Sequence, residues 1–65
     1  HQAKAYRVDF VTDQGWSGYF DTRNPRVVEQ VTKALNQSNP VTIVGEVERC
    51  IYKFLVVLGG GIRIL

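Results

Sequence analysis

The chain has 65 residues, 45% of them hydrophobic, which is typical of one small globular domain and unlike a disordered segment. Its single cysteine excludes an intrachain disulfide, and with one histidine, at position 1, a four-ligand zinc site is not expected. The net charge of +2 arises from eight cationic and six acidic side chains without a basic block, so charge alone does not indicate nucleic-acid binding.

We expect a single domain over residues 1–65. Because the chain does not begin with Met, His1 and Gln2 are interpreted as a tag remnant, or the chain as a fragment of a longer protein. The longest uncharged apolar run, residues 54–62, is far shorter than the roughly 20 residues of a membrane span, so no span is expected. The free cysteine and the lack of a visible signal peptide favour a reducing, cytoplasmic location.

Residues 6–22 predict a β-hairpin, because apolar and polar side chains alternate on both sides of a short polar loop. A three-residue loop ending at Gly15 separates the apolar face from the polar face, whereas a two-residue loop mixes them. In this register Arg7 lies opposite Asp21, and glycine occupies the position where such loops take a left-handed residue. Trp16 then belongs to the apolar face.

A helix is predicted over residues 25–36. Asn24 is a good N-cap, and Pro25 suits the first helical position because its missing N–H would be unpaired there. The helix is too short to persist alone, so its apolar stripe is expected to pack on the apolar face of the hairpin. The stripe consists of Val27, Val28, Val31, Ala34 and Leu35.

The last third of the chain allows two interpretations. Residues 41–48 alternate and predict a strand, whereas residues 47–58 place apolar side chains at helical spacing. The β-branched and aromatic content of residues 51–58 favours a continuous strand there instead. Residues 59–61, all glycine, then form a turn, and residues 62–65 form a short terminal strand.

The expected fold class is therefore α+β. A small antiparallel sheet carries one helix packed on a face, in the order ββαββ with an optional short fifth strand. If residues 47–58 are helical, the order becomes ββαβαβ.

No set of residues suggests catalysis, so we expect a protein that is not an enzyme and uses no cofactor or metal. Cys50 has no histidine partner in the body of the chain, and a small buried apolar side chain is its simpler role. The glycines at 59–61 are followed by Ile62 and Arg63 instead of the Lys-Ser/Thr pair of a phosphate-binding loop, so a turn is their simpler role.

The leading functional prediction is a non-enzymatic interaction or assembly module that forms homo-oligomers or binds another protein. If residues 51–58 are extended, apolar side chains lie on both of their faces, and one helix cannot cover both. The expected self-association residues are Tyr52, Phe54, Leu55, Val56, Val57 and Leu58.

The alternative prediction is a nucleic-acid-binding module. Arg23 and Arg26 flank the helix start, where backbone N–H groups attract anions. Together with Arg7, Lys33 and the exposed aromatic Tyr19 they form a modest basic corner. Ordinary solvated surface charge is the simpler interpretation of these cations.

Overall fold

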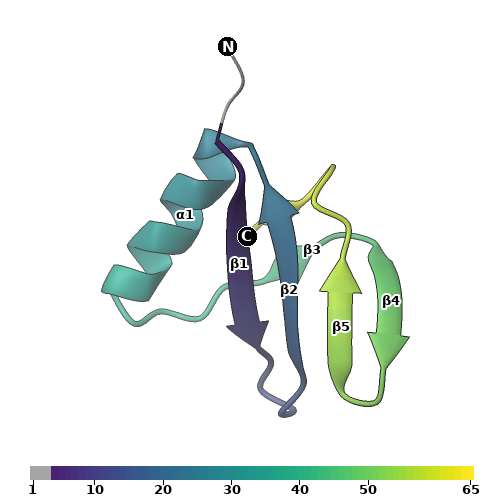
Figure 1. The fold of residues 1–65 in the computed structure, drawn as a ribbon. Coiled ribbons are helices and arrows are strands. Elements are labelled where there is room, and N and C mark those ends of the chain that lie inside the picture. The colour runs from purple at the N-terminus through teal and green to yellow at the C-terminus, as the bar shows by residue number, and fades with distance from the viewer. Residues whose placement is uncertain (1–3) are drawn as a thin grey trace.

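The computed structural model describes residues 4–65 and contains one helix and six strands within them (Figure 1). The expected tag remnant at residues 1–2 lies outside the described residues. A four-stranded sheet has the strand order β1-β2-β5-β4, and β3 and β6 form a second, two-stranded sheet. The element bounds are β1 (Tyr6–Val11), β2 (Ser17–Thr22), α1 (Pro25–Asn36), β3 (Ile43–Val44), β4 (Val47–Ile51), β5 (Phe54–Val57) and β6 (Arg63–Ile64).

The N-terminal hairpin has the predicted register. Arg7 lies opposite Asp21, and β1 and β2 are antiparallel. The Thr12 N–H donates to the Trp16 carbonyl at 2.7 Å, and Gly15 has a φ of +85°, so the three-residue loop with a left-handed glycine is confirmed. Trp16 is half-buried.

The helix also has its predicted bounds and cap. The Asn24 side chain accepts a hydrogen bond from the Arg26 N–H at 3.0 Å, and Pro25 begins the helix. The apolar stripe is only partly covered: Val27 is buried, whereas Leu35 at the far end is 77% exposed. The expectation that the whole stripe packs on the hairpin is therefore wrong at its C-terminal end.

The last third of the chain differs from both interpretations. Residues 51–58 do not form one strand, because Tyr52 and Lys53 make a two-residue turn between β4 and β5. A helix over residues 47–58 is also wrong. The strand predicted at 41–48 is divided, since β3 pairs with β6 and residues 45–46 separate it from β4. The turn at residues 59–61 and a short terminal strand are confirmed.

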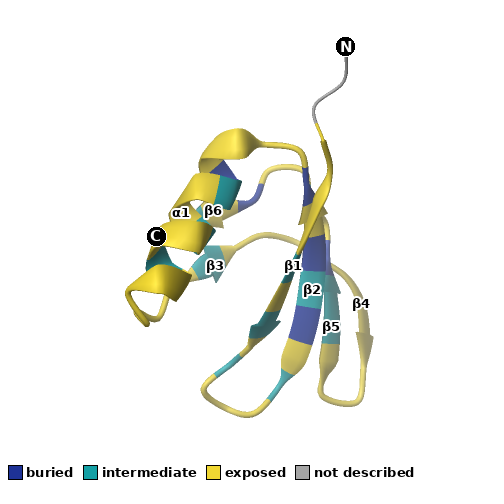
Figure 2. Cartoon of the chain, turned by 60° about the vertical axis from the view of Figure 1, so that its left-hand side comes forward, coloured by how far each residue is buried: buried dark blue, intermediate teal, exposed yellow. Residues whose placement is uncertain are grey.

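The α+β class is confirmed and the order is roughly the predicted ββαββ, with four strands after the helix, but the prediction of an antiparallel sheet is wrong. β2 and β5 pair in parallel, so the sheet is mixed instead of wholly antiparallel. The connection between these two strands crosses one face of the sheet and contains α1 and β3. Figure 2 shows α1 and the β3–β6 pair on the same side of the four-stranded sheet.

The core lies between this layer and the sheet. Its buried members are Phe20 from β2, Val27 from α1, Val57 from β5 and Ile62 before β6. The end of the sheet that carries the two hairpin turns extends beyond the helix (Figure 2). A large part of the sheet is therefore left without cover from the domain itself.

Candidate interaction surface

The C-terminal hairpin, residues 47–57, forms one edge of the four-stranded sheet. β4 pairs with β5 on one side only, and all five of its residues are exposed. This arrangement leaves a row of backbone N–H and C=O groups along the outer side of β4, which we call the free edge. Such an edge is a template for pairing with another strand.

Large apolar side chains are exposed along the C-terminal hairpin and directly after it. Ile51 at the end of β4 is 59% exposed, and Tyr52 in the turn is 86% exposed. Val47, Phe54 and Leu58 are exposed as well. Burial of such side chains against a partner would remove apolar surface from water, which stabilises the complex by about 25 cal/mol for each Å² of apolar surface buried.

The predicted self-association residues divide into three groups in the structure. Tyr52, Phe54 and Leu58 are exposed, whereas Leu55 and Val56 are half-buried. Val57 is buried in the domain's own core. Ile51 also belongs to this surface and was not predicted from the sequence, because alternation alone does not reveal a turn at residues 52–53.

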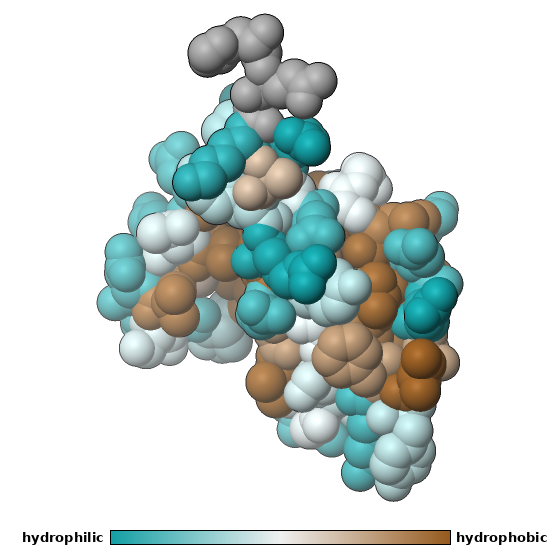
Figure 3. Space-filling view, viewed as in Figure 1, coloured by the Kyte–Doolittle hydropathy of each residue, from teal (hydrophilic) through white to brown (hydrophobic). Residues whose placement is uncertain are grey.

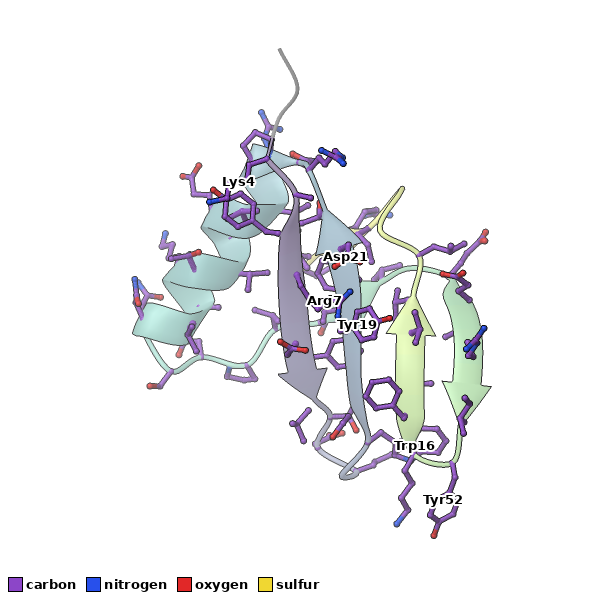
Figure 4. The ribbon with its side chains drawn as sticks, in the orientation of Figure 1. Lys4, Arg7, Trp16, Tyr19, Asp21 and Tyr52 are labelled. Carbon is purple, nitrogen blue, oxygen red and sulfur yellow. The ribbon has the colours of Figure 1, made fainter. Side chains whose placement is uncertain are left out.

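The outer face of the sheet, which points away from α1, carries an aromatic pair. The ring centroids of Tyr19 and Phe54 are 6.0 Å apart, and the Arg7 guanidinium lies 4.1 Å from the Tyr19 centroid. Figure 4 shows Arg7, Tyr19 and Asp21 together on this face, and Figure 3 shows hydrophobic side chains over β5 and β4 beside them. The contact of Phe54 with Tyr19 could not be predicted from the sequence, because the parallel β2–β5 pairing is not visible in local patterns.

Arg7 is held by an acidic neighbour. Its Nε donates to Asp21 Oδ1 at 3.0 Å, and this hydrogen bond, followed by charge attraction, raises the pKa of Arg7 above its ordinary value. Both side chains are more than half exposed, so this ion pair contributes little to stability. The Asp21 carboxylate therefore already neutralises Arg7, the cation that lies over the Tyr19 ring.

The other residues of the predicted basic corner are spread over α1. Arg23 precedes the helix and Arg26 is in its first turn, whereas Lys33 is in its last turn, about 10 Å away along the helix axis. Arg7 and Tyr19, by contrast, lie together on the outer face. The structure therefore places Arg7 in contact with Tyr19 on the outer face, whereas Lys33 lies at the far end of α1 from Arg26.

A cavity of about 650 Å³ lies where the glycine turn at residues 59–61 meets the start of α1. Arg23 and Asn24 also line it. The helix N-terminus offers little to an anion here, because the Arg26 N–H donates to the Asn24 side chain and the N–H groups of Val27 and Val28 donate to the Asn24 carbonyl. This cavity does not support a phosphate site.

Within residues 4–65 no group of three or more His, Cys, Asp or Glu side chains is arranged to hold a metal ion. In the same part of the chain, no helix combines the length and the apolar character needed to cross a bilayer. No family model, curated protein or solved structure matches the chain.

Proposed function

We propose that this chain is a small, non-enzymatic interaction module that self-associates through its C-terminal hairpin and acts as an assembly domain. The observation that carries the proposal is the free edge of β4, a strand of five exposed residues with a partner strand on one side only. Exposed apolar side chains lie in the same hairpin, at Ile51, Tyr52 and Phe54. Pairing with a second copy satisfies the backbone groups and buries those side chains together.

The small core gives a second reason for association. Only four hydrophobic side chains are buried within the described residues, and a chain of this size is marginally stable without disulfides or metals. Association adds stability by mass action, since the partner binds the folded state only. The free thiol of Cys50 suits a reducing compartment such as the cytoplasm.

Ile51→Lys is expected to weaken self-association by about tenfold or more while the domain stays folded. The substitution replaces an apolar contact worth about 1.5–3 kcal/mol with a charge, and about 1.4 kcal/mol corresponds to a factor of ten in Kd. Ile51 is a better site for this test than Leu55, which packs against the domain's own core. Light scattering after gel filtration measures the mass, and circular dichroism verifies the fold.

The matched control is Val11→Lys. Val11 is 74% exposed at the end of β1, the opposite edge strand of the same sheet. This variant receives the same charge on a β-branched residue that is also more than half exposed, and its self-association should equal that of the wild type. Equal dissociation of both variants would show that added positive charge, and not the position of β4, is responsible.

Binding of single-stranded nucleic acid is the second candidate function. Its support is the pair of Tyr19 and Phe54 on the open outer face, because exposed rings on a sheet stack on bases. We rank it second because Asp21 already engages Arg7, the nearest cation. Binding of a labelled oligothymidine should then weaken with salt and fall about fivefold or more in Phe54→Ala. Salt-independent binding, or none, would exclude this function.

A further inference from the structure

We propose that β4 pairs antiparallel with β4 of a second copy about a two-fold axis, with Cys50 opposite Cys50 of that copy. This inference rests on the proposed function and names its partner strand and register. The pairing joins two four-stranded sheets into one continuous sheet. Three independent features of the free edge lead to it.

The first feature is the direction of the backbone groups. The Ser17 N–H donates to the Lys53 carbonyl at 3.0 Å, so the backbone of Lys53 is turned towards β2. The direction of the backbone N–H and C=O groups alternates from residue to residue along a strand. Those of Leu55 therefore also point towards β2 and make no hydrogen bond to β4. Cys50 lies opposite Leu55. Its N–H and C=O therefore point away from β5, to the free edge.

The neighbouring contact agrees with this alternation. The Leu58 N–H donates to the Glu46 carbonyl at 2.8 Å. The backbone groups of the even-numbered residues in β5 and of Leu58 therefore point towards β4, and those of the odd-numbered residues, such as Leu55, point towards β2. Cys50 thus presents one donor and one acceptor to an incoming strand. Two copies of Cys50 facing each other exchange both hydrogen bonds, as in the hydrogen-bonded pair of an antiparallel ladder.

The second feature is the length of the regular edge. The pairing of β4 with β5 is irregular between Val47 and Arg49, and the turn begins at Tyr52. A bulge of this kind disrupts the ladder and twists the strand. The regular part of β4 therefore comprises residues 49–51, and Cys50 is its midpoint.

The third feature is charge. In a two-fold antiparallel pair, the residue at the axis lies opposite its own copy. An axis at Glu48 or at Arg49 places two like charges directly opposite each other, which is destabilising. An axis at Cys50 places two neutral side chains there instead.

The registers further out are also unfavourable. An axis at Val47 sets Glu46 opposite Glu48, twice by symmetry. An axis at Ile51 sets Arg49 opposite Lys53 in the same way. With the axis at Cys50, Arg49 lies opposite Ile51 of the second copy, and the aliphatic part of the arginine covers the apolar side chain.

The register makes a chemical prediction for the thiols. Opposed residues in a hydrogen-bonded antiparallel pair have Cα atoms about 5.5 Å apart, which is within the range of a disulfide. Diamide, which takes up two hydrogen atoms as two thiols form one disulfide, should convert the wild-type protein to a covalent dimer. The dimer is read on a non-reducing gel.

Two control variants carry the thiol elsewhere, in a chain with Cys50→Ala. Val11→Cys places it on the opposite edge strand, and Ile51→Cys places it one residue away on β4, with its copy about 7–8 Å away across a diagonal. At protein concentrations that give equal fractions of dimer by sedimentation, wild-type protein should cross-link about tenfold faster than either control. Equal cross-linking rates would overturn the proposed register. If sedimentation of the same sample still showed a dimer, the chain would self-associate through another register or another surface. A monomer overturns both.

A second test does not use the thiol. Under the proposed register residue 51 faces Arg49 of the second copy, so Ile51→Glu should retain at least about fivefold more dimer affinity than Ile51→Lys. Both variants lose the same apolar side chain and gain a long charged one, and they differ chiefly in the sign of the new charge. Equal weakening by the two variants contradicts the register, because residue 51 would then face no cation.

Discussion

Phe20→Ala is expected to leave the domain largely unfolded at room temperature. Phe20 is 0% exposed and is the centre of the core formed with Val27, Val57 and Ile62. Truncation of a buried phenylalanine lowers the free energy of unfolding by about 3–5 kcal/mol. A domain of this size has about that much stability in total, so little folded protein remains.

Circular dichroism and the fluorescence of Trp16 measure this outcome, in samples dilute enough to be monomeric. Tyr52→Ala is the control, because Tyr52 is an aromatic side chain in an exposed turn. Its free energy of unfolding should change by less than about 0.5 kcal/mol. A Phe20→Ala domain that unfolds cooperatively with nearly wild-type stability would show that the core lies elsewhere.

Gly59→Ala is expected to have the second-largest effect. A Cβ at residue 59 would overlap the carbonyl oxygen of Asp21, which is a backbone atom of β2 and cannot rotate away. The turn at residues 59–61 must then move away from β2. This movement also displaces Ile62, the next residue, from the core. We expect a loss of at least about 2–3 kcal/mol in the free energy of unfolding, at the upper end of overpacking effects.

Gly60→Ala is the matched control in the same turn. A Cβ at residue 60 would meet no atom within 4 Å, and the backbone there is not left-handed. Its stability in urea denaturation should remain within about 0.5 kcal/mol of the wild type. Similar losses in the two variants would mean that the flexibility of the glycine turn matters, and not the close approach to Asp21.

The N-terminal half could be predicted from the sequence because its signals are local. Arg7 opposite Asp21 and the glycine at the end of the loop select one register. Asn24 and Pro25 mark the start of the helix within one turn. Each of these signals acts between residues that are neighbours in the chain or across one hairpin.

The C-terminal half could not be predicted in the same way. Tyr52 and Lys53 make a tight turn without glycine, proline, asparagine or aspartate, and Lys53 adopts a left-handed φ of 60°. The parallel pairing of β2 with β5 depends on a long crossover, which no local period encodes. The apolar side chains on both faces of residues 51–58 indicated that one face needs a partner to bury it. They did not indicate which face, and Val57 lies in the domain's own core.

The proposed assembly follows from where the crossover places β4. The helix and β3 are used to cover one part of the sheet, so the hairpin that follows them lies at the far edge with its outer side unpaired. The short regular stretch of residues 49–51 limits pairing to a small ladder. A self-associating edge of this size forms a defined dimer more readily than an open-ended fibre, because the bulge interrupts continued pairing.

Sedimentation equilibrium of the wild-type chain over a micromolar concentration series tests the central claim most directly. The proposed function predicts an apparent mass that rises with concentration from the 7.4 kDa of the chain to twice that value. Ile51→Lys should shift the whole curve to higher concentration, and Val11→Lys should not. A wild-type mass that stays at 7.4 kDa throughout the series would contradict self-association through the C-terminal hairpin.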